Sequence, residues 1–572
     1  MFVKQFIIII SVLFFSDQIY SQGILRVNGK SIINGEGQEI ILRGMGLGGW
    51  MLQEPYMLQL GGIAANQSGV RSKIIDLVGE DRTNTFYNAW LANHCRKADI
   101  DSLAAWGFNS ARLPMHYNLF TPATEQEPVA DKNTWLPKGF QLTDSLLSWC
   151  KANKIYLILD LHAAPGGQGN DIAISDRDTS RPSLWQSELN KQKTIALWRK
   201  LAERYAKEPW IGGYDIINET NWGFQNATDK NGCAETGNAP LKKLLTDITD
   251  AIRQVDKKHI IFIEANCWAN NYNGIFPLWD NNIVVSFHKY WNYNDQQSIQ
   301  KFIDIREKYN VPVWCGESGE NSNTWFTAAI ELFEKNKIGW AWWPLKKFGL
   351  NNPLQVKQNN GYKQLISYWK GQSSKPSREV AFNALMQLTE DIKAEDNVVH
   401  KDVTDAMFRQ VHSFKTKPFK QHIIKAGTIV FAVDYDLGRN GFAYFDDDSA
   451  NYHVSTGKRT PGNRGGQYRN DGVDIEACTD ALTNGFNVNW IEDGEWLQYT
   501  MNVTKTGSFN LNIRTAANDT AEIKLTVNNV ALSQKISLVK TAGENEWKTT
   551  TVKNFHLTKG LNRFKILAVK GG

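Results

Sequence analysis

The chain has 572 residues and a formal net charge of +5, with 64 basic and 59 acidic residues spread along it. No block of like charge marks a nucleic-acid or membrane-surface binder, so we expect neither a nucleic acid nor a membrane as partner. At roughly 100 to 200 residues per domain, this length predicts two or three domains. Aromatic residues make up 12% of the chain, including 21 Trp, which suits apolar cores and also the flat surfaces that bind sugars.

The N-terminus has the pattern of a secretory signal peptide. Lys4 precedes an apolar run from Phe6 to Phe15, and small and polar residues follow around Ser21. The run is too short to span a bilayer. We therefore predict a signal peptide over residues 1–22 and a mature protein that is secreted, periplasmic or held at the cell surface.

The cysteines are scattered and have no CxxC spacing. They are Cys95, Cys150, Cys233, Cys267, Cys315 and Cys478. This distribution predicts neither a metal site nor a disulfide scaffold. In an exported protein it allows zero to two disulfides, and the spacing does not reveal their pairing.

Eight short apolar runs alternate with helical patterns between residues 23 and 372. The runs begin at Ile40, Phe108, Ile155, Ile211, Ile260, Ile283, Val311 and Ile338. Continuous apolar strands that alternate with helices are typical of a parallel sheet covered by helices. Eight such units predict an α/β fold, a (β/α)8 TIM barrel over residues 23–372, because no glycine-rich phosphate loop follows the first strand.

Polar residues stand at the ends of these strands, where a barrel of this kind has its active site. They are Arg112, His162, Asn218, Glu219, Glu264, Asn266, His288, Tyr290, Glu317 and Trp343. Glu219 and Glu317 end the fourth and seventh strands and would project into one cleft from opposite sides. Cleavage of a glycosidic bond requires such a pair of carboxyl groups. Taken singly, Glu219 also fits a helix N-terminal acid and Glu317 a partner for a buried arginine, but the whole set favours catalysis.

Seven stretches, in chain order, resemble glycoside hydrolase family 5: "LRGMGLGGWMLQEP", "ARLPM", "DLHAAPGGQ", "IINET", "HKY", "GES" and "GWAWWPLK". The first and third look most like the exo-β-1,3-glucanase branch. The resemblance implies that Glu219 is the general acid/base and Glu317 the nucleophile of a retaining double displacement, with no metal or other cofactor in catalysis. Asn218 would bind the sugar 2-hydroxyl, and Arg112 would keep the nucleophile ionised.

The resemblance also implies roles for residues around the two glutamates. His288 and Tyr290 would hydrogen-bond around them, and Trp343 would form the floor under the reacting sugar. Trp340 is the neighbour expected in the core. His162 either binds sugar or props the strand ends, and both roles stay open.

Three further residues bear on the assignment. Glu264 and Asn266 are expected to support the site or to form subsites. Thr220 stands where the family usually has proline, which weakens the subfamily assignment but not the chemistry. The carboxyl groups of Glu219 and Glu317 should lie about 5 to 5.5 Å apart, the spacing of a retaining enzyme.

We therefore predict a retaining β-glycosidase that hydrolyses β-linked glucan. The sequence leaves open β-1,3 or β-1,4 linkage, glucan or mannan, and internal or terminal attack. The enzyme's partner would be a polysaccharide or oligosaccharide, and we expect a monomer. One alternative is a transglycosylase that passes the sugar to a carbohydrate acceptor. The other is a non-catalytic glucan-binding protein, which the presence of both glutamates with Arg112 and Tyr290 disfavours.

The last third of the chain changes character twice. Residues 373–426 are polar with a helical pattern and predict a helical extension of the barrel domain. From Gly427 on, short alternating runs separated by Gly, Asn and Asp predict an all-β jelly-roll sandwich over residues 427–572.

The stretches "YRNDGVDIEA", "NWIEDGEWLQYTMNV" and "EWKTTTV" resemble a carbohydrate-binding module of family 6. The resemblance implies that Trp490 and Trp547 face a sugar-binding cleft, although each also fits a core position. It allows a structural calcium ion in this module. The family's pattern continues past Gly572 with a final strand, so we expect either that the sequence is a fragment or that this sandwich lacks its last strand.

Overall fold

The computed structural model describes residues 23–129, 132–226, 228–460, 462–531, 534–543 and 545–571. The predicted signal peptide over residues 1–22 lies outside these described residues. Within the described ranges, none of the helices combines the length and the apolar character that crossing a membrane requires.

Eight parallel strands close into a barrel in the order β10, β3, β4, β5, β6, β7, β8, β9. The strands are β3 Arg43–Gly46, β4 Ser110–His116, β5 Tyr156–Ala163, β6 Ile211–Asp215, β7 Ile261–Glu264, β8 Ile283–Lys289, β9 Val313–Gly319 and β10 Gly339–Trp343. Strands such as β5 and β8 are buried along their whole length, which is why they read as continuous apolar runs rather than alternating ones. The predicted (β/α)8 barrel is confirmed.

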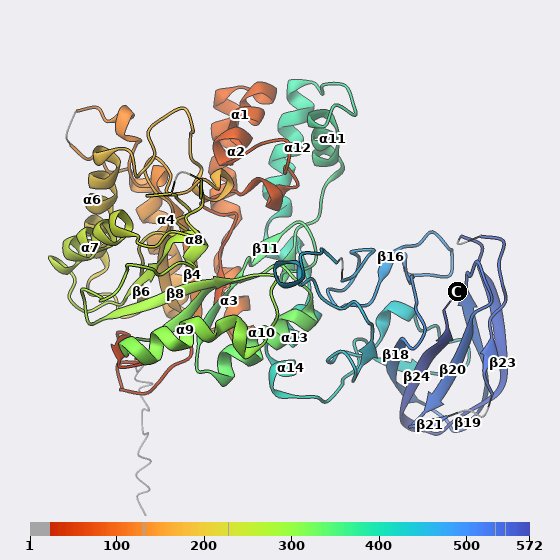
Figure 1. The fold of residues 1–572 in the computed structure, drawn as a ribbon. Coiled ribbons are helices and arrows are strands. Elements are labelled where there is room, and N and C mark those ends of the chain that lie inside the picture. The colour runs from red at the N-terminus through yellow and green to blue at the C-terminus, as the bar shows by residue number, and fades with distance from the viewer. Residues whose placement is uncertain are drawn as a thin grey trace, which may run out of the picture.

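Helices surround the barrel (Figure 1). They are α3 Lys97–Trp106, α4 Pro137–Ala152, α6 Glu188–Tyr205, α7 Ala239–Arg253, α9 Gln296–Tyr309 and α10 Asn323–Lys335, with the short α5 Ile172–Ser175 and α8 Asn266–Ala269. In α7, the buried residues include Leu241, Leu244, Leu245, Ile248 and Ile252. This spacing places them on one apolar stripe that packs against the barrel.

Short strands lie outside the barrel. They are the antiparallel pair β1 Arg26–Asn28 and β2 Ser31–Ile33, and the small sheet of β11 Lys346–Lys347, β12 Leu354–Gln355 and β13 Val398–Val399.

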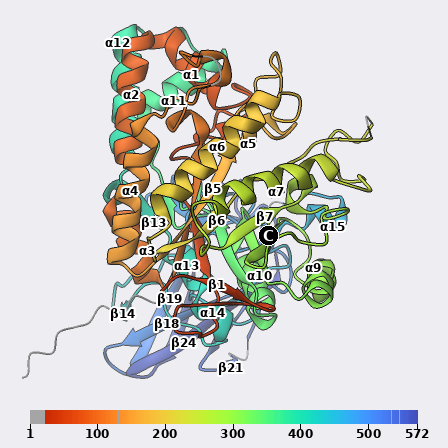
Figure 2. The same ribbon diagram turned by 90° about the vertical axis from the view of Figure 1, so that its left-hand side faces the viewer.

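Four helices form a second hydrophobic core beside the barrel. They are α1 Gln67–Val78, α2 Glu80–Asn93, α11 Asn360–Trp369 and α12 Arg378–Asp391, which stand together in both ribbon views (Figures 1 and 2). Phe86, Trp90, Tyr362 and Leu385 are among the buried residues of this core. Residues 373–426, which were predicted as a helical extension, thus begin with helix α12. This helix packs on α1 and α2, which lie near the N-terminus. The later helices of this stretch, α13 Lys401–Met407 and α14 Arg409–His412, pack on α10.

The C-terminal region is all-β apart from one helical turn, α15 His453–Thr456, and a short 3₁₀ helix. Its main sheet has the order β14, β18, β24, β20, β21, with β15 beside β18 and β22 beside β20, while β16–β17 and β19–β23 form separate antiparallel pairs. The strands are β14 His422–Ile424, β15 Tyr444–Phe445, β16 Ile475–Ala477, β17 Phe486–Val488, β18 Trp496–Val503, β19 Gly507–Thr515, β20 Glu522–Val527, β21 Val530–Ala531, β22 Ile536–Ser537, β23 Lys548–Leu557 and β24 Gly560–Lys570. One core joins the main sheet to β19 and β23, as in a sandwich. Strand β14 lies within the stretch that was expected to be helical, and it pairs in parallel with β18.

A buried polar network connects the barrel domain to the C-terminal region. The Asn323 amide at the start of α10 donates to Asp402 at 2.9 Å and to Asp471 at 3.0 Å. The Asn323 backbone N–H donates to the carbonyl of Asn470 at 2.8 Å, and the Asn470 N–H donates to Asp402 at 2.9 Å. Because the polar groups of such a network must satisfy one another when buried, it fixes the contact geometry of the two parts.

Candidate active site

Two glutamates face each other at the mouth of the barrel. Glu219 follows β6, and Glu317 lies near the end of β9. One carboxylate oxygen of Glu219 and one of Glu317 lie within 4.8 Å of each other. So close an approach of the two carboxylates matches the separation of about 5 to 5.5 Å in retaining glycosidases better than the roughly 6.5 to 9.5 Å of inverting ones.

Arg112 organises the nucleophile side of the site. Its guanidinium is buried and donates to Glu317 Oε2 at 2.9 Å and to Asn218 Oδ1 at 2.8 Å. It also donates to Glu264 Oε1 and Asp215 Oδ2, each at 2.9 Å. Burial lowers the pKa of Arg112, but the surrounding carboxylates outweigh this effect and hold the pKa well above its ordinary value. A permanent cation therefore stands beside Glu317, as the sequence predicts.

Glu219 has the environment of a proton donor. Burial raises its pKa to about 7, even though the neighbouring His288 acts in the opposite direction. His288 Nδ1 lies 2.6 Å from Glu219 Oε1, and His288 Nε2 lies 3.1 Å from Glu264 Oε1. Burial lowers the pKa of His288, but Glu264, Glu219 and Glu317 together hold it well above its usual value. A carboxyl group with a pKa near 7 can be protonated before the reaction and ionised after it.

Glu264 supports both halves of the site, as expected for it. Its Oε2 accepts a hydrogen bond from the Glu219 backbone N–H at 2.7 Å, while Oε1 accepts from Arg112. Burial raises the pKa of Glu264, but His288 and Arg112 outweigh burial and bring the pKa down to about 2. Glu264 is thus a fixed anion that orients Arg112, His288 and the backbone of Glu219.

Glu317 is held at both oxygens. The Tyr290 hydroxyl donates to Oε1 at 2.7 Å, and Arg112 donates to Oε2 at 2.9 Å. The structure therefore brings together the residues that the sequence assigned to the glutamates, with Tyr290 on Glu317 and His288 on Glu219. Two directed hydrogen bonds fix the carboxylate in one orientation, which is what attack on a single ring carbon requires.

Trp343 and His162 form a stack at one side of the site. Their ring centroids lie 5.0 Å apart with an interplanar angle of 7°. A Cβ on Gly46 would lie 2.6 Å from the Trp343 ring and one on Gly48 would lie 2.7 Å from it, so only glycine leaves room for this indole. His162 Nδ1 lies 2.8 Å from Asp160 Oδ2, and the ring is almost fully buried. This buried placement favours a structural role for His162, in which the ring supports the strand ends, over direct binding of sugar.

The other tryptophans of β10 lie in the core. Trp340 and Trp342 are almost fully buried, and their ring centroids lie 5.6 Å apart. Trp340 packs on Phe108 and Phe408. Trp343 is thus the residue of this run that reaches the site.

Glu54 is a candidate site residue that received no role from the sequence. It precedes the 3₁₀ turn η1 Pro55–Leu58, is 7% exposed, and its carboxyl group makes no hydrogen bond in the described part of the chain. Burial raises its pKa well above normal, and so do Glu317, Glu320 and Glu219. One sequence feature indicated a role for Glu54, because the residue belongs to the first stretch that resembles family 5. Glu54 lies on a loop, however, whereas the candidate residues were chosen at strand ends.

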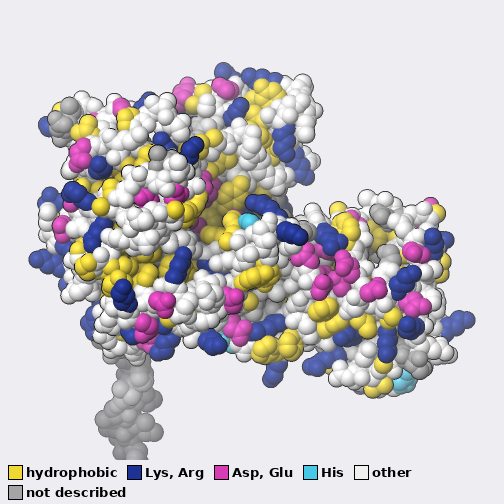
Figure 3. Space-filling model, viewed as in Figure 1, with side chains coloured by type: hydrophobic (Ala, Val, Ile, Leu, Met, Phe, Trp, Pro, Cys, Tyr) yellow, Lys and Arg dark blue, Asp and Glu magenta, His cyan; other side chains and the backbone are white. Residues whose placement is uncertain are grey.

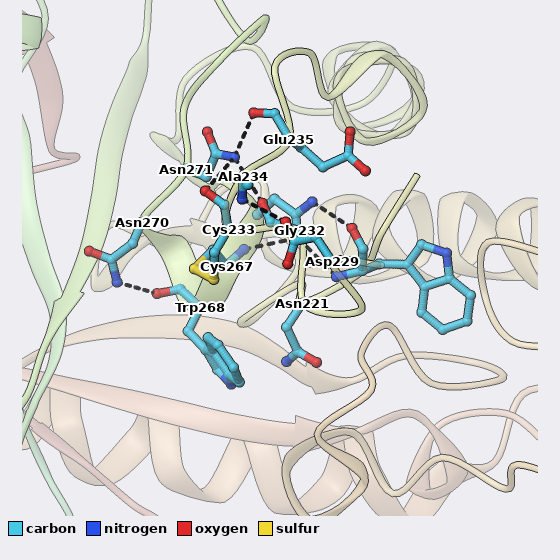
Figure 4. Close-up of a disulfide and its surroundings, with 12 residues drawn as sticks. Asn221, Asp229, Gly232, Cys233, Ala234, Glu235, Cys267, Trp268, Asn270 and Asn271 are labelled. Carbon is cyan, nitrogen blue, oxygen red and sulfur yellow. Dashed lines mark hydrogen bonds between the residues drawn. A yellow bond between two sulfur atoms is a disulfide. The ribbon is translucent and has the colours of Figure 1, made fainter. Parts of the chain in front are cut away.

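Cys233 and Cys267 form a disulfide (Figure 4). It joins the loop after β6 to the residues after β7, with Cα atoms 4.8 Å apart. The side chain of Asn266 accepts from the Trp222 N–H at 3.0 Å and donates to the Trp222 carbonyl at 2.7 Å. Asn266 therefore holds two loops together at the mouth. One disulfide falls within the expected range, and the other four cysteines are free.

Within the described residues, Glu219, His288 and Glu317 are the group of three His, Cys, Asp or Glu side chains whose donor atoms all lie within 4.8 Å of one another. The donor atoms of these three residues already bind one another, Tyr290 and Arg112. A cation there would compete with the proton that Glu219 must carry, so the donor set suits acid–base chemistry better than metal binding.

The C-terminal region has a cavity of its own. Trp490 and Trp547 both line it, together with Trp496, Phe445 and Arg514, and its volume is about 310 Å³. Trp490 is 41% exposed, so it is not a core residue. The structure thus places both predicted tryptophans at one cavity.

Two family models match the chain. Residues 69–349 match the one described as Cellulase (glycosyl hydrolase family 5), in agreement with the geometry of the two glutamates. The barrel is a glycoside hydrolase family 5 domain. Because family 5 enzymes are retaining glycosidases that need no cofactor, the chain is an O-glycosyl hydrolase of the retaining type.

The second match corrects the sequence interpretation of the C-terminal region. Residues 469–572 match the model described as Carbohydrate binding module (family 35), so the resemblance to family 6 is not confirmed. The broader prediction, a carbohydrate-binding module behind a family 5 barrel, is confirmed.

Curated relatives match the chain at low identity. A beta-xylosidase of Phanerodontia chrysosporium is 26% identical over 379 residues, covering 60% of this chain and 75% of the relative. Endoglucanase C of Acetivibrio thermocellus is 25% identical over 315 residues, covering 44% and 83%. A probable glucan 1,3-beta-glucosidase A of Aspergillus clavatus is 24% identical over 277 residues, covering 47% and 60%.

Proposed function

We propose that this family 5 enzyme hydrolyses β-1,3- or β-1,4-linked glucan. The observation that carries the proposal is the pair of carboxylate oxygens of Glu219 and Glu317 within 4.8 Å of each other. The names of two relatives, an endoglucanase and a probable glucan 1,3-beta-glucosidase, support glucan as the substrate.

The reaction follows from the two environments. In the first step Glu219 protonates the leaving oxygen while Glu317 attacks the anomeric carbon, which gives a covalent glycosyl-enzyme. In the second step Glu219, now ionised, takes a proton from water, and the resulting hydroxide displaces Glu317 from the sugar. Arg112 and Tyr290 hold Glu317 for attack and stabilise it as the leaving carboxylate. Asn218 is fixed through its oxygen by Arg112, and its amide nitrogen lies 3.4 Å from His162 Nε2, which leaves the second N–H of that nitrogen as a donor for the sugar 2-hydroxyl.

A panel of purified polysaccharides tests this function. The enzyme should release soluble sugar from β-1,3-glucan or β-1,4-glucan faster than from xylan or mannan. Product sizes then separate terminal from internal attack, and products longer than the substrate would indicate transglycosylation. Hydrolysis of xylan or mannan alone would contradict the proposed substrate.

Glu54 is proposed to bind a hydroxyl group of the sugar beside Glu317. Because its buried carboxyl group has no hydrogen-bond partner among the described residues, a sugar hydroxyl would satisfy it. Replacing Glu54 by Leu should lower kcat/KM on a soluble glucan oligosaccharide about two- to ten-fold, as for loss of one hydrogen bond between neutral groups. Steady-state kinetics of Glu54→Leu beside Glu54→Gln, which keeps one donor and one acceptor, provide the measurement. Equal kcat/KM in the parent and in Glu54→Leu would exclude the contact.

The C-terminal module is proposed to bind glucan through the cavity at Trp490 and Trp547. Aromatic rings at a partly open cavity suit the C–H faces of sugars. Trp490→Ala and Trp547→Ala should each weaken pull-down on insoluble glucan several-fold while kcat on a short soluble substrate stays unchanged. Pull-down and kinetics on the same preparations separate the two effects. Undiminished pull-down of both variants would mean that the cavity does not bind this polysaccharide.

A structural calcium ion in the same region is a further proposal. Figure 3 shows acidic side chains gathered on the part of the C-terminal region nearest the barrel domain. Burial raises the pKa of Asp446 to about 8, with contributions from Glu495 and Asp474. Calcium binds carboxylates together with backbone carbonyls and water, and it would relieve this repulsion. Thermal unfolding with calcium and with a chelator should differ by several degrees, and equal midpoints would contradict calcium binding.

We also propose that residues 1–22 direct export and that the mature enzyme is a monomer. The support is the apolar run behind Lys4 and the oxidised pair Cys233–Cys267, which suits an oxidising compartment. Fractionation of expressing cells and the mass of the purified protein in solution test the two statements. Retention of the full-length chain in the cytoplasm would contradict export, and a dimer mass would contradict the monomer.

A further inference from the structure

Residues 449–456, near the start of the C-terminal region, lie against the mouth of the barrel. The Ser322 hydroxyl donates to the Ser449 carbonyl at 2.5 Å. The Asn321 side chain donates to the Asn451 carbonyl at 2.7 Å and accepts from the Asn451 N–H at 3.0 Å. Asn321 and Ser322 follow directly after β9, the strand that carries Glu317. The 449–456 segment is thus anchored close to the nucleophile.

The same segment braces the loop that follows β8. The Val454 N–H donates to the Trp291 carbonyl at 3.0 Å, and the Tyr293 N–H donates to the Ser455 hydroxyl at 2.9 Å. The His453 ring packs on the Trp291 indole with centroids 5.0 Å apart. Helical turn α15 therefore contacts this loop through its backbone, a hydroxyl and a ring.

Trp291 links the 449–456 segment to the chemistry. Its indole N–H donates to the Glu320 carbonyl at 3.0 Å, and its ring lies 5.1 Å from that of Tyr290. Tyr290 in turn donates to Glu317 at 2.7 Å. The φ angle of Trp291 is 52°, a left-handed conformation that a bulky residue keeps only where its surroundings enforce it.

The inner side of the loop is held from within the barrel. The Lys289 ammonium donates to the Tyr293 carbonyl at 2.9 Å and to Asn294 Oδ1 at 2.7 Å. Its charge lies 4.9 Å from the centre of the Trp325 ring. These contacts fix the far end of the loop, whereas the backbone at Trp291 faces the 449–456 segment. The outer contacts therefore act together with the hydrogen bond from the Trp291 indole to the Glu320 carbonyl, and between them they hold Trp291 from both sides.

We propose that the 449–456 segment completes the catalytic unit, and that His453 is a positioning residue that acts through Trp291 on Tyr290 and so on Glu317. The proposal rests on the proposed role of Glu317 as nucleophile. The C-terminal region would then have a second function besides binding polysaccharide. It would stabilise the barrel mouth through a hydrogen bond between Asn321 and Asn451, which are 130 positions apart in the sequence.

The first experiment compares His453→Ala and His453→Phe in the full chain on a short soluble aryl β-glucoside. His453→Ala should lower kcat about ten-fold with KM changed less than two-fold, because a small displacement of a catalytic group costs rate rather than binding. His453→Phe should keep the parental kcat, since a ring can still pack on Trp291. His556→Ala, an exposed histidine on β23, is the matched control and should behave as the parent. Thermal unfolding confirms that each variant is folded.

A double-mutant cycle with Tyr290→Phe identifies the route of the effect. If His453 acts through the Tyr290 hydroxyl, then His453→Ala should change kcat less than two-fold once that hydroxyl is gone. A ten-fold loss in both backgrounds would overturn the proposed route, and parental kcat in His453→Ala would overturn the proposal itself. A parent that cleaves no β-glycoside at all would instead contradict the proposed function, and the positioning role with it.

Discussion

Replacing Glu317 by Ala should lower turnover of polymer and of activated aryl glycosides alike, by about 10⁴-fold or more. The side chain supplies the nucleophile of the first step, so a better leaving group cannot compensate for its loss. Steady-state rates on β-glucan and on a dinitrophenyl β-glucoside measure both substrates with one preparation. Loss on polymer with near-parental rates on the activated substrate would contradict the nucleophile role.

Azide and a matched variant sharpen this assignment. Azide can occupy the space of the missing carboxylate and attack the sugar directly, which would give a glycosyl azide of inverted configuration. Glu317→Gln keeps the shape and two hydrogen-bonding atoms for Tyr290 and Arg112 but cannot serve as the same nucleophile, so it should fold and remain inactive. NMR of the product reads the configuration. A retained azide from Glu317→Ala would mean that the roles of the two glutamates are reversed.

The barrel and its two glutamates could be predicted because local pattern and position coincide. A parallel strand buried on both faces reads as a continuous apolar run, so a polar pair such as Asn218 and Glu219 marks the point where the run reaches the mouth. Tyr290 and Glu317 follow the same rule at other strand ends, whereas Arg112, which was also expected at a strand end, lies inside β4 and reaches Glu317 through its long side chain. Their mutual contacts then follow from closure of the barrel rather than from further sequence signals.

Other parts of the site depend on contacts that no local pattern specifies. The Cys233–Cys267 disulfide joins two loops, and the lengths of these loops do not predict that the two cysteines come close together. Glu54 lies on a loop, where neither hydrophobic periodicity nor the end of a strand predicts a functional residue. The His453–Trp291 contact spans the boundary between the barrel and the C-terminal region, so it depends on the arrangement of two separately predicted parts.

The helical extension illustrates the same limit at the level of the fold. A helical pattern predicts an apolar face but not the partner of that face. Helix α12 places Ala381, Leu385 and Leu388 against a core shared with α1 and α2, which lie almost 300 residues earlier (Asn93 and Thr389, 296 positions apart, share a hydrogen bond). The prediction of helices in this stretch therefore carried no information about the second core.

Glu219→Ala should fail in a different way from Glu317→Ala, because it removes a proton donor and leaves the nucleophile in place. A polysaccharide leaving group needs protonation, so hydrolysis of glucan should fall about 10²- to 10⁴-fold, the usual contribution of general acid catalysis. Dinitrophenolate is a weak base that leaves without a proton. The first step should therefore survive on the dinitrophenyl β-glucoside, and the glycosyl-enzyme should accumulate as a burst followed by slow turnover.

The pH dependence provides the second measurement on Glu219. Its pKa is raised to about 7, so the acid form needed in the first step is present below about pH 7 and is lost as the pH rises through that value. The parent's kcat/KM on glucan oligosaccharides should accordingly fall on the alkaline side near pH 7. In Glu219→Ala, the residual kcat/KM on the same oligosaccharides should lose this alkaline limb, because no proton donor remains to titrate. Azide should restore turnover of the accumulated intermediate and give a glycosyl azide of retained configuration. An unchanged alkaline limb, or an inverted azide, would show that Glu219 is not the acid/base.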